Sequence, residues 1–106
     1  MDECVMVQTT LGSSEQAEAL AARMVKQRLA ACVHRNSIHS IYRWEGAIEQ
    51  DNEIRLTFKT TLAVKNALIQ AIKEAHPYEV PELIVIPITD GDPDYLRWIS
   101  EMCQPV

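Results

Sequence analysis

Two helical patterns, each flanked by strand patterns, restrict the possible folds of this chain more than any other feature. Apolar residues recur at helical spacing from Ala17 to Leu29 and again from Val64 to Ala75. A β-branched run at residues 4–10 precedes the first pattern, and an apolar run at 83–88 follows the second. Two more strand patterns separate the helices. The predicted order is therefore strand, helix, strand, strand, helix, strand.

Helix-capping residues predict where the helices begin and end. Ser13, followed by Gln16, fits a capping box for a first helix that ends near Leu29 or Ala30. We expect Thr61 to cap the second helix, which the His76-Pro77 pair ends. A third helix follows at the C-terminus, with Asp92 as its cap and Pro93 in its first turn.

The two middle strands should form a long hairpin. After a polar break at residues 34–36, residues 38–44 read as a strand, and Gly46 lies in the turn that follows. Residues 52–60 alternate between apolar and polar side chains, with Ile54, Leu56 and Phe58 facing one side. The sequence therefore predicts a hairpin centred near Gly46.

This order of elements predicts a ferredoxin-like α+β sandwich with an extra C-terminal helix, in one domain covering residues 1–106. In that fold two helices cover one face of the sheet. The run from Leu83 to Ile88 is apolar at nearly every position, so we expect it to be buried on both faces. Tyr42 and Trp44 add further apolar surface. We infer that another subunit covers this surplus.

Composition narrows the class of protein. The chain has 106 residues and a formal net charge of -5, without a basic cluster, so nucleic acid and anionic membranes are not expected partners. The apolar runs are shorter than the roughly 20 residues that cross a bilayer. The acidic N-terminus lacks a signal-peptide pattern, and a cytoplasmic location is expected. The three cysteines form no CxxC pair, so neither a disulfide framework nor a zinc finger is predicted.

The segment from His76 to Glu82 is the strongest candidate site. Pro77 and Pro81 stiffen it, and it carries an imidazole, a phenol and the carboxylates of Glu79 and Glu82. One imidazole and two carboxylates suit a borderline divalent metal ion. The alternative for His76 is a favourable interaction with the C-terminal end of the helix dipole.

Cys32 is a second candidate ligand, because thiolates bind soft metals such as Cu(I) and Zn(II). The alternative is a small buried residue, since free cysteine is among the most buried residue types. No nucleophile elbow, phosphate-binding loop or HExxH motif occurs, so the chain is not predicted to be an enzyme.

Five motifs in this chain resemble those of the CutA family of bacterial divalent-cation tolerance proteins. The resemblance extends from about Val5 to Ile99, and the motifs occur in the family's order and spacing. They are Leu29-Ala-Ala-Cys32, Tyr42-Arg-Trp-Glu-Gly46, Phe58-Lys-Thr-Thr61, His76-Pro-Tyr-Glu-Val-Pro-Glu-Leu83, and Gly91-Asp-Pro-Asp-Tyr95 with Trp98.

The resemblance implies a homotrimer shaped like the PII signalling proteins, with a link to copper and other divalent metals. It also implies that the metal ligands include Cys32 and His76, to which we add Glu79 and Glu82. Thr9 and Ala71 hold positions where some family members have further cysteines. Histidine and carboxylate ligands should therefore contribute more here.

Three functions remain open from the sequence. The first is a trimer that binds divalent metal, copper above all, in metal tolerance, without a tightly bound cofactor. The second is a PII-like regulatory trimer that binds a small anionic ligand in a cleft between subunits. That cleft would be lined by Trp44, Lys59, Tyr78, Tyr95 and Trp98. The third is a purely structural scaffold trimer.

Overall fold

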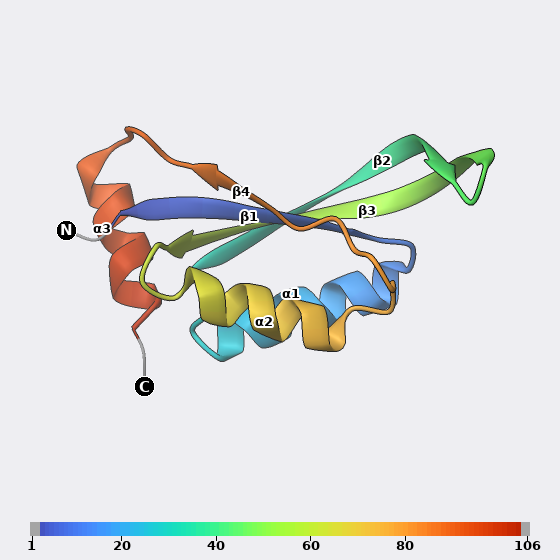
Figure 1. Ribbon diagram of the computed structural model, residues 1–106. Helices are drawn as coiled ribbons and strands as arrows, with labels where there is room; N and C mark the ends of the chain where they lie inside the picture. The colour runs from blue at the N-terminus through green and yellow to red at the C-terminus, as the bar shows by residue number, and fades with distance from the viewer. Residues whose placement is uncertain (1–2, 105–106) are drawn as a thin grey trace.

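A computed structural model describes residues 3–104 as a four-stranded sheet with three helices (Figure 1). The strands lie in the order β2-β3-β1-β4, and all neighbours are antiparallel. The predicted ferredoxin-like sandwich with an added C-terminal helix is thereby confirmed. The elements in chain order are β1 (Cys4–Leu11), α1 (Ser14–Lys26), β2 (Cys32–Trp44), β3 (Ala47–Thr61), α2 (Lys65–Ala75), β4 (Ile84–Pro87) and α3 (Pro93–Met102).

The main core lies between the sheet and the pair α1 and α2, which both cover one face of it (Figure 1). Val7 pairs with Phe58 in the centre of this face, and neither is exposed to solvent. The helices contribute the apolar stripes that the sequence predicts. Their buried members are Ala17, Leu20 and Met24 from α1, and Leu68 and Ile72 from α2.

Two predicted helix caps are confirmed and one is wrong. Ser13 Oγ accepts a hydrogen bond from the Gln16 backbone N–H at 3.2 Å. Asp92 accepts one from Tyr95 N–H at 3.1 Å. Thr61 instead ends β3, where it pairs with Cys4, and α2 begins without a side-chain cap. Strand pairing therefore decides the role of Thr61, although its residue type would suit a cap.

The hairpin is longer than predicted, and the expected polar break at residues 34–36 is wrong. β2 pairs with β3 without interruption from Cys32, opposite Lys59, to Trp44, opposite Ala47. The turn between them uses two residues with positive φ, Glu45 at 49° and Gly46 at 82°, a combination that matches the twist of the flanking strands. The distal half of the hairpin extends well past the helices (Figure 1).

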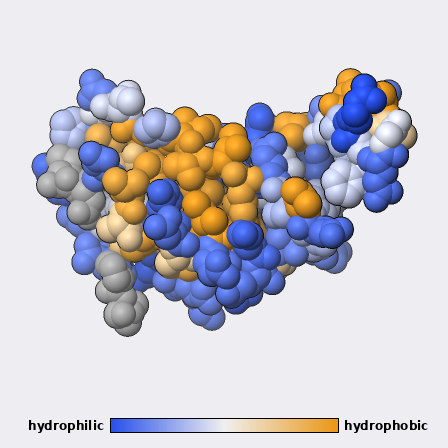
Figure 2. Space-filling view, in the orientation of Figure 1, coloured by the Kyte–Doolittle hydropathy of each residue, from blue (hydrophilic) through white to orange (hydrophobic). Residues whose placement is uncertain are grey.

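The expectation that the last strand is buried on both faces is wrong within this chain. β4 lies at the edge of the sheet, where Ile84 is 45% and Val85 39% exposed. Figure 2 shows the consequence, a continuous hydrophobic area in the middle of the view over β4. α3 covers only one end of the sheet, where Ile99 and Cys103 form a small second core with Cys4.

Candidate functional site

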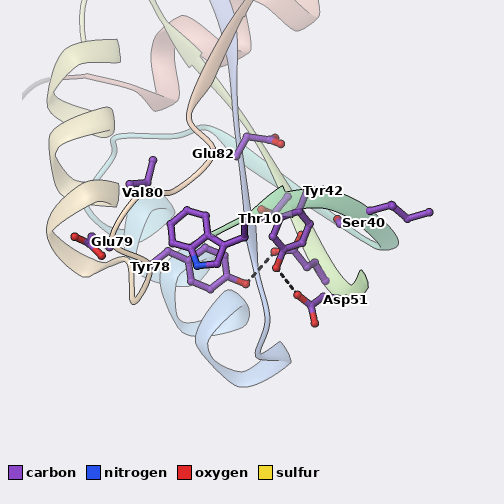
Figure 3. Close-up of a pocket in the computed structure, with 11 residues that line it drawn as sticks. Thr10, Ser40, Tyr42, Asp51, Tyr78, Glu79, Val80 and Glu82 are labelled. Carbon is purple, nitrogen blue, oxygen red and sulfur yellow. Dashed lines mark hydrogen bonds between the residues drawn. The ribbon is translucent and has the colours of Figure 1, made fainter. Parts of the chain in front are cut away.

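A cleft of about 630 Å³ opens where the hairpin meets the segment that follows α2 (Figure 3). Three parts of the chain contribute to it: the end of β1, the distal half of the hairpin, and the proline-flanked segment. The lining residues are Thr10, Ser40, Ile41, Tyr42, Trp44, Asp51, Glu53, Tyr78, Glu79, Val80 and Glu82.

The lining of this cleft is acidic. It includes the four carboxylates of Asp51, Glu53, Glu79 and Glu82, and none of the lining residues is a lysine, arginine or histidine. Opposite charges attract, and the effect is strongest where water is partly excluded. The cleft therefore favours a cation, and its charge does not suit the small anionic ligand considered above.

Tyr78 and Glu53 form the buried part of the cleft. The Tyr78 hydroxyl donates to Glu53 Oε2 at 2.9 Å, and Glu53 is only 9% exposed. Burial, and then this hydrogen bond, raise the pKa of Tyr78 above its ordinary value. The phenol therefore stays protonated and supplies the hydrogen bond that a buried carboxylate needs.

Tyr42 and Asp51 repeat this pairing at the exposed side of the cleft. The Tyr42 hydroxyl donates to Asp51 Oδ2, and the bond to this carboxylate raises the pKa of Tyr42 to about 12. Figure 3 marks both hydrogen bonds with dashed lines. Each carboxylate keeps further lone pairs that a cation can use.

His76 does not line the cleft. It contacts the backbone of two residues that do, Thr10 and Tyr78. Its Nε2 lies 2.9 Å from the carbonyl oxygen of Thr10, and its Nδ1 lies 3.1 Å from the backbone N–H of Tyr78. A carbonyl only accepts and an N–H only donates, so the ring is neutral with its proton on Nε2. Burial likewise lowers the pKa of His76.

Both nitrogens of His76 are therefore engaged by the backbone, which leaves no lone pair for a metal ion. The imidazole instead ties the segment after α2 to β1. Its ring also contacts the ring of Tyr78 edge to face, with centroids 4.8 Å apart. His76 thus fixes the position of Tyr78 over Glu53.

Cys32 lies away from the cleft. It pairs with Lys59, which in turn pairs with Met6 of β1. Thr10, which lines the cleft, is roughly 13 Å farther along β1 at the usual rise of a strand. Within one protomer the structure therefore separates Cys32 from Glu79 and Glu82, and the four ligands proposed from sequence do not come together in a single chain.

Within one protomer, the aromatic and basic residues expected in a cleft between subunits also lie in separate places. Trp44 and Tyr78 line the cleft, whereas Lys59 contacts His34 at the opposite end of the hairpin strands. Tyr95 and Trp98 stack on each other on α3, with ring centroids 5.7 Å apart.

One protomer does not complete a metal site. Within residues 3–104 no three His, Cys, Asp or Glu side chains are grouped closely enough to hold a metal ion. Figure 3 shows why: Glu79 lies on one side of Tyr78 and Asp51 on the other, while Glu82 extends separately above them.

Asp51 and Glu53 are the two cleft carboxylates that the sequence did not predict. A signal for them was present, because they continue the two-residue alternation of Arg55 and Lys59 along the same face of β3. The sequence does not reveal which tyrosines bind these two carboxylates. Tyr78 meets Glu53 only after α2 has returned the chain to the hairpin.

Comparison with known proteins gives consistent results. The family model described as CutA1 divalent ion tolerance protein matches residues 5–102. A divalent-cation tolerance protein CutA from Citrobacter koseri is 41% identical over 99 residues, which cover 92% of this chain and 86% of that protein. These names describe tolerance to ions and indicate no catalytic activity.

Solved structures agree in fold. CutA from Synechococcus elongatus is 34% identical and superposes with a TM-score of 0.94, covering 98% of this chain and 93% of that one. A CutA from Archaeoglobus fulgidus, described as a periplasmic divalent cation tolerance protein, is 34% identical with a TM-score of 0.92 and covers 95% and 99% of the two chains. No helix among residues 3–104 is long and apolar enough to cross a membrane. The cytoplasmic location stays a prediction.

Proposed function

Since this chain belongs to the CutA1 divalent ion tolerance protein family, we propose that it acts in metal tolerance as a homotrimer that binds a divalent cation at the acidic cleft. The observation that carries this proposal is the lining itself. Four carboxylates and two carboxylate-bound phenols surround a cleft whose lining residues include no cationic side chain.

The lining also indicates which cations to expect. Carboxylate and hydroxyl oxygens are the ligands of hard ions such as Ca²⁺, Mg²⁺ and Mn²⁺. The expectation of copper rested on Cys32 and His76, which lie outside the lining. We therefore rank hard divalent cations above copper at this cleft. Copper(II) is the ion with which their binding should be compared.

Assembly supplies the ligands that one protomer lacks. Hard cations take about six to eight oxygen ligands, more than the separated carboxylates of one chain provide. The distal hairpin also exposes large apolar side chains, Ile41 at 65% in the lining of the cleft and Ile48 at 59% outside that lining. Such surface is typical of an interface. A neighbouring protomer on the hairpin would cover it and add oxygen atoms to the cleft.

The cleft's size and aromatic lining favour a second candidate, a regulatory trimer that binds a small organic cation. About 630 Å³ is more than a bare ion fills, and Tyr42, Trp44 and Tyr78 offer ring faces that attract ammonium groups. This candidate is still a PII-like regulatory trimer, but its ligand is a cation instead of the anion expected from the sequence.

Sedimentation velocity and thermal unfolding test the proposal together. The expected result is a trimer whose unfolding temperature rises with millimolar calcium or manganese, because a ligand that binds only the folded state stabilises it. Stabilisation by a polyamine but not by any metal would favour the second candidate. A trimer insensitive to both would instead support the scaffold function.

A further inference from the structure

Polar and basic side chains cover part of the sheet face opposite α1 and α2. Leu56 and Phe58 point to the helices, so the alternation of a strand places Arg55, Thr57 and Lys59 on the other face. Strand pairing sets their neighbours on that face, which are Asn36, His34 and Cys32 on β2, and Thr10, Gln8 and Met6 on β1. None of these residues carries a carboxylate, so this part of the face is positively charged.

Arg55 is a cation on this face that lacks a partner. Its side chain is partly buried. Its guanidinium makes no hydrogen bond or ion pair within the described part of the chain, where the ion pair present joins Arg97 to Asp94. The nearby Glu53 binds the Tyr78 hydroxyl instead. A guanidinium has five N–H donors in a rigid fork, and burial makes it costly to leave them without acceptors. The structure therefore indicates an acceptor from outside this chain.

Thr57 lies next to Arg55 on the same face and offers a hydroxyl donor. Its Oγ1 lies 3.1 Å from Nε2 of Gln8, and this amide nitrogen donates, so Thr57 accepts the bond. A hydroxyl group can accept and donate at once. The hydroxyl proton of Thr57 is therefore available to the same acceptor as Arg55.

Lys59 adds a positive charge from the other side of Thr57. Its Nζ lies 3.1 Å from Nδ1 of His34, which is the direct neighbour of Thr57 on β2. The Lys59 side chain therefore leans along the strand toward Thr57. Arg55 and Lys59 each lie roughly 6–7 Å from Thr57 along β3 at the usual rise of a strand, which both long side chains can span.

We propose that this face binds a phosphate group at Thr57, between Arg55 and Lys59. The arginine fork binds two oxygens of a phosphate at once, lysine adds a point charge, and the hydroxyl donates to a third oxygen. A carboxylate has only two oxygens and engages the three side chains less completely. None of the three lines the acidic cleft, whose carboxylates repel an anion. The phosphate site is therefore independent of the cation proposed for that cleft.

Calorimetric titration of the whole protein at constant ionic strength tests the site. The protein is first freed of metal, and the chelator is then removed because it is itself an anion. The probes are inorganic phosphate, pyrophosphate and phenyl phosphate. The expected result is one phosphate bound per chain. Phenyl phosphate that binds as tightly as inorganic phosphate would assign the site to a phosphate ester, and weaker binding of this ester would assign it to the free ion.

Substitutions separate a specific site from general attraction. Arg55→Met should lower the affinity for phosphate at least about tenfold, and Thr57→Val about threefold. Arg55→Lys keeps the charge without the fork, so it should still fold and should bind several-fold more weakly than the wild type. Arg43→Met is the matched control. It removes the same charge from an exposed arginine of β2, opposite Ile48 in the distal hairpin, and should bind like the wild type. Circular dichroism checks that every variant is folded.

Three results would overturn the proposal. The first is that no phosphate probe binds at millimolar concentration. The second is an equal loss of affinity in Arg55→Met and Arg43→Met, which would reduce the effect to net charge. The third is tighter binding of succinate than of phosphate, which would show that Arg55 binds a carboxylate.

Discussion

The hydroxyl group of Tyr78 lies 2.9 Å from Glu53 Oε2, and this hydrogen bond joins the segment after α2 to the middle of β3. Glu53 is nearly buried, so the bond compensates a carboxylate that has lost most of its water. The same contact fixes the wall of the acidic cleft. Stability and the geometry of the candidate site are therefore linked through one phenol.

Tyr78→Phe should destabilise the protein by about 1–3 kcal/mol, because it leaves a buried carboxylate without its donor. Urea unfolding measures the loss. Tyr42→Phe is the matched control, since it removes the equivalent bond to Asp51 at an exposed position and should cost clearly less. Equal losses in the two variants would show that burial of Glu53 does not matter.

Gly12→Ala should also disturb the hydrogen bond between Tyr78 and Glu53, because it crowds the Tyr78 hydroxyl group. A Cβ atom at Gly12 would lie 3.1 Å from the Tyr78 hydroxyl oxygen, which is tighter than ordinary packing allows. We expect the free energy of unfolding to fall in the wild-type background and to fall less in Tyr78→Phe, where the crowded oxygen is missing. A double-mutant cycle measures this coupling. Additive losses would contradict it.

His76 should make stability depend on pH in a defined direction. Its pKa is lowered in the folded state by burial, so below its ordinary value of 6.5 the unfolded chain binds the proton more readily. The stabilising contribution is therefore present above that pH and is lost as the pH falls below it. Urea unfolding at about pH 5 and about pH 7 should show a smaller difference in His76→Gln than in the wild type.

His39 provides the control of opposite sign. Its pKa is raised, chiefly by the hydrogen bond with Asn52, so any contribution it makes is present at low pH and lost as the pH rises. His39→Gln should therefore not reduce the loss of stability in acid. If it did so as strongly as His76→Gln, the pH dependence would not belong to His76.

The overall fold was predictable from the sequence because its signals are local. The alternation around Phe58 and the caps at Ser13 and Asp92 each act within a few residues. The wrong predictions concern tertiary contacts. Thr61 has a residue type that suits a helix cap, but it pairs with β1 as the last residue of β3. Residues 34–36 have the polar character of a break, but they form regular strand pairs with β3.

The candidate site was predictable only in part, for the same reason. The rigid segment with Tyr78, Glu79 and Glu82 does line a cleft, and Trp44 joins it. The role of His76 depends on a carbonyl of β1 far away in sequence, which no local pattern reveals.

The exposed tip of the hairpin gives a prediction for assembly. Ile41→Asp should weaken the proposed trimer in sedimentation velocity, because it introduces a charge on exposed apolar surface in the lining of the cleft. It should barely change the secondary structure, since Ile41 is 65% exposed in the single chain. Leu62→Asp, at an exposed site near the start of α2, is the control. A trimer that tolerates Ile41→Asp and not Leu62→Asp would contradict assembly through the hairpin.

Calorimetric titration of manganese or calcium tests the central claim most directly. We predict that the wild type binds the ion and that the double variant Asp51→Asn with Glu82→Gln loses at least about tenfold in affinity, because two cleft carboxylates lose their charge. The double variant Glu18→Gln with Glu101→Gln changes the net charge equally at exposed positions outside the cleft and should bind like the wild type. Equal affinities in all three proteins would contradict cation binding at the acidic cleft.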